Sequence, residues 1–597
     1  MAEMVNIIIN GKAKSVPEGV TILEAARHAG IRIPTLCYLK EINAIGACRI
    51  CVVEVKGSRV LVAACVHPVT EGMEITTDSP AVFNARKTTL ELILSTHTKE
   101  CLTCVRSDNC ELQKLCHIFK VEDENYYDGF TPSRPIDDSA VHLVRDNNKC
   151  ILCRRCVAAC AGWQGLGVIG TNDRGFETHI ACAFELPLER VSCVSCGQCI
   201  TVCPTGAISE KDNTGEVWEA LDDPDKHVVV QTAPSIRATL GEAFGFPVGT
   251  DVTGKMVAAL RHLGFDRVFD TDLAADMTVV EEAHELIERV KGGGVLPLIT
   301  SCSPGWVKYC EYYYPDLIPN LSTCKSPQQM FGATVKTWYA EKMGWDPGDI
   351  FVVGIMPCTA KKFEVKREGQ NAAGVFDVDV ALTTRELARM IDRAGILFAE
   401  LPDEEFDHHL GESTGASVIF GTTGGVMEAA LRTAAEWITG GHVEKVEFGD
   451  VRGMEGVKEA IYSIGDLVIN VAAVSGLGNV PKVMDRVRKG KANYHFIEVM
   501  CCPGGCINGG GQPVQPAYVR NFIDLKAKRA EVLYKADAGK TLRKSHKNPS
   551  LNKIYDEFFI GYGSEKAHEV LHTTYEDRSQ RRILDKALTP PSLQEKR

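Results

Sequence analysis

The sequence predicts an α+β multidomain protein, and three observations support this fold class. The 597 residues are enough for several domains at about 100–200 residues each. Most of the 24 cysteines fall in tight groups near the amino terminus, whereas strand-like and helix-like segments alternate from residue 226 onward. Hydrophobic residues (45%) and charged residues (24%) occur at the frequencies of ordinary globular proteins. We therefore expect small cysteine-rich domains followed by a larger α/β domain.

The first predicted domain, residues 1–80, is a small β-grasp domain with four spaced cysteines. A β-like start at 5–9 and a turn at Asn10-Gly11 precede a helix-like segment at 22–27. The cysteines show a gap of ten residues followed by Cys-x-x-Cys, which is close to the plant-type pattern for a [2Fe–2S] cluster. A zinc site is the alternative. The predicted ligands are Cys37, Cys48, Cys51 and Cys65.

The second predicted domain, residues 81–125, contains one histidine and three cysteines in a short stretch: His97, Cys101, Cys104 and Cys110. One imidazole and three thiolates suit a [4Fe–4S] cluster, but the same set is also common in zinc sites, so spacing alone leaves both open. Iron is favoured because a zinc ion would interrupt an electron path between neighbouring clusters.

The third predicted domain, residues 140–212, carries the strongest pattern in the chain. Two runs of Cys-x-x-Cys-x-x-Cys-x-x-x-Cys are typical of a two-cluster ferredoxin, in which the fourth cysteine of each run binds the other [4Fe–4S] cluster. Cys116 and Cys182 are left over, and we expect them to be inert buried thiols. The predicted sets are Cys150, Cys153, Cys156 and Cys203 for one cluster, and Cys193, Cys196, Cys199 and Cys160 for the other.

Between these runs, residues 165–170 match the glycine string of a dinucleotide-binding turn. The string lacks a bracketing strand and helix, so we interpret it as a loop. The chain then has no nicotinamide or flavin site of its own. Such chemistry would require a partner subunit.

From residue 226 the pattern is that of parallel α/β layers. Strands are predicted at 227–231, 295–299, 350–355 and 494–499, with an amphipathic helix at 279–287. Each of the last three strands runs into cysteine, and the carboxyl ends of parallel strands meet at one edge of a sheet. We therefore expect one metal site there, with unrelated core cysteines at the three strand ends as the alternative. The thiols concerned are Cys302, Cys358, Cys502 and Cys506.

Three loops now carry a family resemblance. Residues 300–306 (TSCSPGW), 356–364 (MPCTAKKFE) and 498–506 (EVMCCPGGC) resemble the signature loops of the [FeFe]-hydrogenases. With the amino-terminal domains, the resemblance covers nearly the whole chain. It implies a two-lobed α/β domain over 226–520 with an H-cluster, which is a [4Fe–4S] cubane joined by one thiolate to a di-iron unit carrying CO, CN⁻ and an azadithiolate. The implied reaction is 2H⁺ + 2e⁻ ⇌ H₂.

The resemblance also implies roles for single residues. Cys358, Cys502 and Cys506 would bind the cubane, with Cys506 as the bridge, and Lys361 would bond a cyanide. Glu364 belongs to the same loop as Lys361, and we expect it to be a catalytic residue as well. Met356 and Met500 would pack against the di-iron unit, and the remaining pocket-lining residues would be Ala233, Pro234, Ser235, Pro327 and Gln328.

The same resemblance implies a proton route of Cys302, Glu282, Ser322 and Glu285. Glu282 and Glu285 are three residues apart and share one helical face. The alternative is that both are ordinary exposed carboxylates. If they are buried near Cys302, a raised pKa would suit them to proton transfer.

One position departs from the family pattern. The usual first loop has two adjacent cysteines, of which the second binds the cubane, but here the second position is Ser303. Either Ser303 binds iron through oxygen, or the loop shifts so that Cys302 does, and no other residue appears in the sequence as a better candidate. The Cys-Ser form is typical of the multisubunit NAD(P)-linked and electron-bifurcating branch. Its partners resemble the flavin and [2Fe–2S] subunits of complex I, and ferredoxin is a further candidate partner.

The net charge and the two ends of the sequence predict the partners, the location and the last domain of the protein. The net charge of −12 argues against nucleic acid as a partner, and the absence of a signal-like start or a long apolar stretch predicts a cytoplasmic protein with no membrane contact. Residues 521–597 resemble the small subunit of periplasmic relatives and are expected to wrap around the α/β domain. The alternative function is a non-catalytic iron–sulfur protein of the same fold that transfers electrons, senses H₂ or assists cluster assembly.

Overall fold

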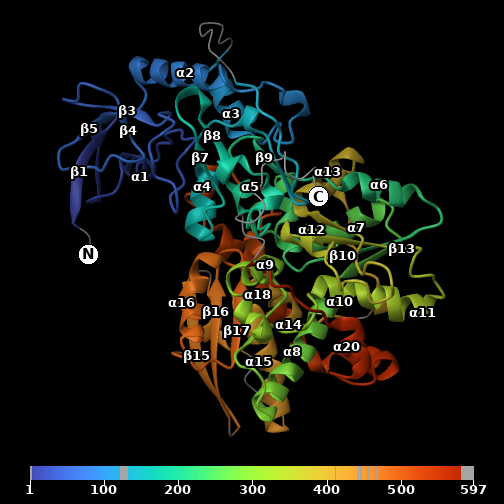
Figure 1. Ribbon diagram of the computed structural model, residues 1–597. Helices are drawn as coiled ribbons and strands as arrows, with labels where there is room; N and C mark the ends of the chain where they lie inside the picture. Colours follow the sequence, from blue (N-terminus) through green and yellow to red (C-terminus); the bar gives the residue numbers. More distant parts are fainter. Residues whose placement is uncertain are drawn as a thin grey trace, which may run out of the picture.

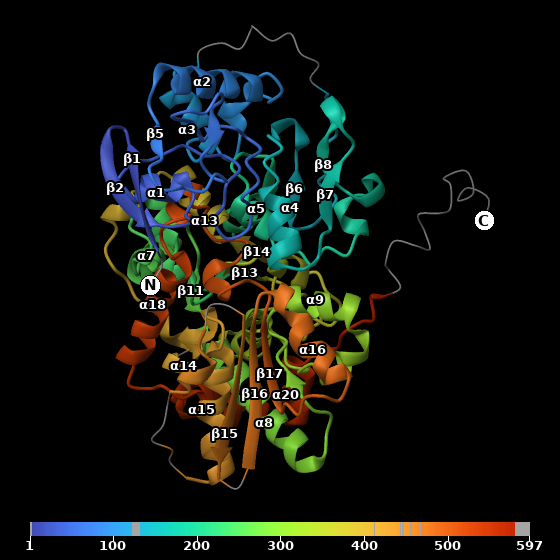
Figure 2. The ribbon, with the colours of Figure 1, turned by 90° about the vertical axis from the view of Figure 1, so that its left-hand side faces the viewer.

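The protein is a multidomain α/β protein in which small cysteine-rich domains form one end and a larger α/β part forms the other (Figure 1). The computed structural model describes residues 3–121, 132–410, 412–441, 443, 447–453, 456–465 and 467–579. In Figure 2 the amino-terminal sheet and helices lie at the top, and strands β15, β16 and β17 lie at the bottom.

The amino-terminal domain is a five-stranded sheet with one helix packed on it. Strands β1 (Met4–Ile9), β2 (Lys12–Pro17), β3 (Val52–Val55), β4 (Val62–Ala63) and β5 (Glu74–Thr76) are arranged in the order β2-β1-β5-β3-β4. β1 alternates between exposed and buried residues, and its inward side chains pack against helix α1 (Ile22–His28). A capping box formed by Thr21 and Glu24 fixes the start of α1.

Two further cysteine-rich regions follow. Helices α2 (Pro80–Leu94) and α3 (Glu111–Ile118) flank the first of them. In the second, strands β6 (Leu143–Arg145) and β9 (Ile208–Glu210) pair antiparallel beside helices α4 (Arg155–Ala158) and α5 (Gln198–Val202). A hairpin of β7 (Ile169–Asn172) and β8 (His179–Cys182) is inserted between the cysteine runs, and the glycine string at 165–170 begins in the loop that enters it and ends in the first two residues of β7.

The α/β part contains two four-stranded sheets. The first has the order β11-β10-β13-β14 and is parallel throughout, with bounds Arg267–Asp270, His227–Thr232, Ile350–Met356 and Val380–Thr383. Val228 and Val230 face helices α7 (Thr253–His262) and α13 (Thr384–Arg393), while Val229 faces helices α8 (Asp272–Gly292) and α10 (Pro327–Thr334). Both faces are covered, which explains the continuous apolar runs of these strands.

The second sheet has the order β12-β17-β16-β15. β12 (Leu298–Ile299), β17 (Phe496–Met500) and β16 (Leu467–Ser475) are parallel, whereas β15 (Gly456–Ile464) is antiparallel to β16. Helix α15 (Gly425–Thr439) packs between this sheet and α8. The strand predicted at 295–299 is shorter than expected, because Val295 is exposed and Pro297 has no N–H to donate.

The carboxyl-terminal segment lies across the α/β part, as Figures 1 and 2 show for α18 and α20. Helix α17 (Ala517–Arg520) leads into it, and the segment contains helices α18 (Leu525–Gly539), α19 (Pro549–Ile554) and α20 (Glu565–Leu571). On α18, the Arg529 guanidinium bonds both carboxylate oxygens of Glu242 at 2.7 Å, and beyond α20 the segment pairs with the backbone near Cys324. Within the described part of the chain, no helix is both long and apolar enough to cross a bilayer.

Candidate metal centre

Three strands from the two sheets end at one cavity. The loops after β12, β13 and β17 bring five thiols and one hydroxyl to its wall, and three of these thiols are the predicted cubane ligands. The sequence prediction that the strand-end cysteines converge on one site therefore agrees with this geometry, although Cys501 was not among the expected residues. The donor atoms belong to Cys302, Ser303, Cys358, Cys501, Cys502 and Cys506.

The rest of the cavity wall is mainly apolar and is built from tightly packed backbone. A Cβ added at Gly509 would lie 2.1 Å from the carbonyl oxygen of Pro357, so the loops fit together only with glycine at this position. The predicted lining residues Ala233, Pro234, Pro327, Gln328, Met356 and Met500 are all present. Ser235 is not in the wall, because its hydroxyl accepts a hydrogen bond from Gln512 behind it at 3.3 Å.

These residues fit an iron–sulfur centre with attached small ligands. Thiolates are the donors that iron–sulfur clusters use. The side-chain oxygen of Gln328 is buried at the wall and has no hydrogen-bond partner among the described residues. An apolar wall with one unpaired polar atom suits a bulky group that needs few hydrogen bonds.

Lys361 brings a positive charge to the cavity. It lies on helix α12 (Ala360–Glu364), and its ammonium donates to the carboxylate of Glu364 at 2.8 Å, the hydroxyl of Ser326 at 2.7 Å and the carbonyl of Cys302 at 3.4 Å. Glu364 itself does not line the cavity. It holds the ammonium in place and balances its charge.

Cys302 and Glu282 form the inner part of the predicted proton route. Burial raises the pKa of the Cys302 thiol well above its ordinary value, and the negative charge of Glu282 adds to this effect. Glu282 is fully buried on α8, and neither carboxylate oxygen makes a well-formed hydrogen bond among the described residues, although the Ser301 N–H and the Ser322 hydroxyl lie close enough to lower its pKa slightly. Burial raises its pKa to about 8, with a further contribution from Glu285. The alternative of an exposed carboxylate does not hold for Glu282.

Ser322 and Glu285 form the outer part of the route. The Ser322 hydroxyl donates to Glu285 at 2.7 Å, and the other oxygen of Glu285 accepts from Arg289 at 2.6 Å. Glu285 and Arg289 are both partly exposed. The four predicted residues therefore extend from the cavity toward the protein surface.

The four cysteines of the amino-terminal domain also converge. The Cys37 and Cys48 thiols contact each other, as do those of Cys51 and Cys65. Cys51 immediately precedes β3, and Cys65 follows β4, so the antiparallel pairing of these two strands brings the loops together.

His97 lies in a small cavity with Cys101, Cys104 and Cys110, as predicted from their spacing. Its Nδ1 atom is buried and has no hydrogen-bond partner among the described residues. A Cβ added at Gly206 would lie 2.5 Å from the Cys104 sulfur, which shows how closely this region packs against the chain after Cys203. The unpaired ring nitrogen and the three thiols fit a metal cluster.

The two cysteine runs cross as a two-cluster ferredoxin requires. Cys203 lines one cavity with Cys150, Cys153 and Cys156. Burial raises the pKa of the Cys199 thiol, and among the neighbouring thiols those of Cys196, Cys193 and Cys160 add most to this effect. Of the two leftover cysteines, Cys182 is buried, and its sulfur accepts a contact from the Arg145 guanidinium. Cys116 is only partly buried.

Direct contacts join the sites. The side-chain amide of Asn43 donates to the carbonyls of Cys37 at 2.7 Å and Cys153 at 3.0 Å, and thereby links the first and third cysteine sites. At the other end, a Cβ added at Gly197 would lie 3.1 Å from the Cα of Gly510, and the Thr359 hydroxyl donates to the Ser195 carbonyl at 2.7 Å. No spacing rule in the sequence indicates these contacts.

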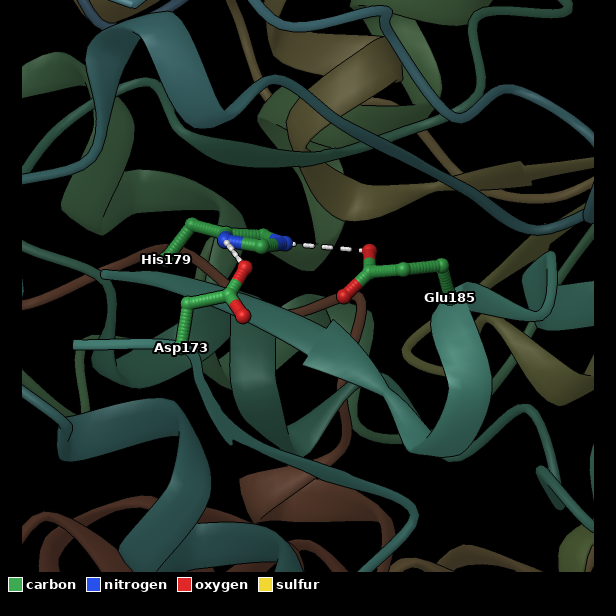
Figure 3. Close-up of side chains that lie close together, drawn as sticks. All are labelled: Asp173, His179 and Glu185. Carbon is green, nitrogen blue, oxygen red and sulfur yellow. Dashed lines mark hydrogen bonds and ion pairs between the residues drawn. The ribbon is translucent and has the colours of Figure 1, made fainter. Parts of the chain in front are cut away.

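A separate group of possible metal ligands lies on the β7–β8 hairpin (Figure 3). His179 contacts Glu185 at 3.0 Å through Nε2 and Asp173 at 3.8 Å through Nδ1. Nδ1 also lies 2.8 Å from the Glu177 carbonyl, to which it can only donate. Asp173 and Glu185 are both exposed, and exposed acidic side chains often gather around a histidine without a metal, so we interpret the group as a hydrogen-bonded surface cluster.

Models of known protein families match the chain in five regions. The "Iron only hydrogenase large subunit, C-terminal domain" matches residues 226–510, and the "Iron hydrogenase small subunit" matches residues 523–578. The other three are the "2Fe-2S iron-sulfur cluster binding domain" (2–80), the "NADH-ubiquinone oxidoreductase-G iron-sulfur binding region" (86–125) and the "4Fe-4S dicluster domain" (149–207).

Individual proteins match over most of the chain. "NADP-reducing hydrogenase subunit HndD" of Solidesulfovibrio fructosivorans is 51% identical over 96% of this chain and 99% of that protein. "Iron hydrogenase 1" of Clostridium pasteurianum is 44% identical over 96% of this chain and 100% of that protein. A solved structure of a variant of apo [FeFe]-hydrogenase HydA1 from Chlamydomonas reinhardtii is 40% identical, covers 62% of this chain and 99% of its own, and has a TM-score of 0.54.

Proposed function

The chain belongs to the [FeFe]-hydrogenases as a catalytic subunit with accessory iron–sulfur domains, and we propose that it works within a complex that couples H₂ to NAD(P). The observation that carries the proposal is the cavity of converging thiols beside Lys361, together with the partly buried Cys302 and the fully buried Glu282. A protein that only transferred electrons would need the thiols but no buried proton donors next to them.

We propose one [2Fe–2S] cluster, three accessory [4Fe–4S] clusters and an H-cluster. The predicted cysteines and His97 would hold the accessory clusters, and Cys358, Cys502 and Cys506 would hold the cubane, with Cys506 as the bridge. When bound, these groups supply one-electron transfer and an open iron site for H₂. The domain limits proposed are 1–80, 81–125, 140–212, 226–520 and 521–597.

The side chains of the cavity handle position and protons. Lys361 is held by Glu364 and Ser326, so it can donate to an anionic ligand without moving. The apolar wall excludes water and keeps the Cys302 thiol protonated. Glu282 can then exchange a proton with Cys302 on one side and with the Ser322–Glu285 pair on the other.

The proposed partners are subunits that carry flavin, NAD(P) and a [2Fe–2S] cluster, with ferredoxin as a further candidate. The similarity to a relative called an NADP-reducing hydrogenase subunit supports this, as does the glycine string at 165–170, which leads into strand β7 and not into the helix that a nucleotide-binding turn requires. A cytoplasmic location is proposed because a large number of cysteines without disulfides is typical of a reducing compartment.

An infrared spectrum of the fully loaded protein in the CO and CN⁻ region, combined with an H₂-oxidation assay, tests the proposal. We expect CO and CN⁻ bands together with H₂-dependent reduction of an artificial acceptor. Absence of the cyanide bands would contradict the H-cluster. Bands without turnover would instead indicate a sensor.

A further inference from the structure

A fifth thiol shares the cavity with the predicted cubane ligands, and we propose that Cys501 supplies the fourth cubane thiolate in place of Ser303. The inference rests on the proposed function, because it concerns the cubane part of the H-cluster. Cys501 is 5% exposed and lines the cavity together with Cys358, Cys502 and Cys506.

The three predicted cysteine ligands are one fewer than a cubane needs. A [4Fe–4S] cubane takes four protein ligands, and Cys358, Cys502 and Cys506 leave one iron without a partner. The cavity offers three candidates for this position: Cys302, Ser303 and Cys501. A thiolate matches the softness of iron–sulfur iron better than a serine oxygen does, so the two cysteines are the stronger candidates on chemistry.

Cys302 packs against a different set of apolar side chains from the cubane ligand Cys502. Cys302 packs in an apolar cluster with Met500 and Phe420, whereas Cys501 and Cys502 pack in another cluster that contains Trp306 and Val194. The carbonyl of Cys302 accepts from Lys361, and its thiol lies near Glu282. This position suits proton exchange and leaves the cubane side to Cys501.

The register of the second sheet places Cys501 beside Ser303. β12 and β17 are parallel neighbours, with Leu298 opposite Phe496 and Ile299 opposite Ile497. Each pair is 198 residues apart, and the same spacing relates Ser303 to Cys501, whose N–H donates to the Ser303 hydroxyl at 3.3 Å. The thiol that the first loop lacks is therefore present one strand away, and Ser303 helps to orient the backbone that carries it.

The backbone of Gly305 packs closely against the Cys501 sulfur. A Cβ added at Gly305 would lie 2.6 Å from this sulfur and 3.2 Å from the Cys501 Cβ, so a larger residue at position 305 would displace the side chain. The thiol also contacts the thiols of Cys502 and Cys196. Cys196 belongs to the adjacent ferredoxin-like site, so Cys501 lies between the cubane position and the neighbouring cluster.

The experiment compares the full-length wild type with C501A, S303A, C358A and the double variant C501A/S303C after reconstitution with iron and sulfide alone. C358A is the reference for loss of the cubane. The readouts are iron per chain, Mössbauer spectra and the EPR spectrum of the reduced protein, none of which depends on turnover. We expect C501A to lose about four iron atoms, as C358A does. S303A should keep them, and C501A/S303C should regain them because it returns the thiol to the first loop.

Two results would overturn the inference. One is a C501A protein with wild-type iron content and an unchanged EPR spectrum. The other is an iron loss in C501A that S303C does not reverse while the accessory clusters remain intact, because misplacement of the loop alone would explain it. If the wild type shows no CO or CN⁻ bands after full loading, the proposed function fails instead, whereas the cubane comparison still reports on Cys501.

Discussion

At the scale of single residues, Glu282 is the most unusual group near the cavity. It is completely buried, makes no well-formed hydrogen bond in the described part of the chain, and has a pKa raised to about 8. An unpaired buried carboxyl group destabilises a protein, so a functional role accounts for it better than a structural one.

Replacement of Glu282 with glutamine is expected to lower H₂ turnover by about 10²–10⁴-fold, the usual contribution of a proton-transferring group. The amide keeps the shape of the side chain but cannot carry the proton. The infrared and EPR spectra should stay unchanged. E288Q, which alters an exposed carboxylate on the same helix, is the control and should have no effect. Wild-type turnover in E282Q would remove Glu282 from the route.

The pKa of Glu282 also predicts how the rate depends on pH. Proton delivery for H₂ formation requires the protonated carboxyl, so its rate should decrease as the pH rises through about 8. H₂ oxidation requires the carboxylate, so its rate should increase over the same interval. Rates of both directions measured from pH 6 to 9 test this. If the change of rate near pH 8 persists in E282Q, another titrating group causes it.

The sequence was sufficient to predict most of the site but not the part that depends on strand pairing. Cys358, Cys502 and Cys506 lie in loops with recognisable patterns, and the structure brings them to one cavity. Cys501 could not be linked to Ser303 from the sequence, because their contact follows from the register of β12 and β17. The sequence also does not show that Glu282 is buried, because its burial depends on the packing of α8 against α15.

At the scale of elements, helix α18 is fastened to the α/β part by buried ion pairs. Asp537 accepts from Arg432 of α15 at 2.8 and 2.9 Å and from Arg543 at 2.7 and 3.1 Å. Arg432 and Asp537 are almost fully buried. Because these charges cannot reach water, Asp537 compensates part of the Arg432 charge, and Glu428, which accepts from Arg432 at 2.8 Å, compensates another part.

D537N should therefore lower the free energy of unfolding by about 3–5 kcal/mol, since it leaves the Arg432 charge under-compensated inside the protein. The midpoint of urea unfolding, followed by far-UV circular dichroism, provides the measurement. E531Q changes an exposed carboxylate on the same helix and should leave the midpoint in place. A urea midpoint for D537N equal to that of E531Q would show that the Asp537 ion pairs contribute little to the free energy of unfolding.

Prediction from sequence was less complete for elements than for ligands. β10 and β13 were predicted closely because both of their faces are buried, which produces continuous apolar runs. β12 is much shorter than the predicted strand, since Pro297 interrupts the donors on its amino-terminal side. The antiparallel β15–β16 hairpin was not predicted at all, because half of β15 faces solvent and its apolar pattern is weak.

At the scale of the whole molecule, the cysteine sites form a sequence from the amino-terminal domain to the cavity. Figures 1 and 2 show the amino-terminal domain at the end opposite the second α/β sheet. Asn43 joins the first site to the third, and the loop at 193–199 contacts the loops of the cavity. The arrangement suits an electron entry point far from the site where protons are used.

C51A should abolish the proposed [2Fe–2S] absorption and greatly reduce NAD(P) reduction by the assembled complex, because it removes one ligand from the outermost site. The CO and CN⁻ bands should persist, since the cavity is not altered. S58A, at an exposed turn of the same domain, is the control. Wild-type NAD(P) reduction in C51A would mean that the electrons leave by another route.

The backbone contact between Gly197 and Gly510 limits how such a protein can evolve. A Cβ at Gly510 would lie 2.1 Å from the Cys196 carbonyl, and one at Gly197 would lie 2.3 Å from the Thr359 hydroxyl. A ferredoxin-like module acquired by gene fusion could occupy this position only with glycine on both sides of the joint. The two modules are therefore not freely interchangeable parts, and a recombined gene would have to inherit this joint as a unit.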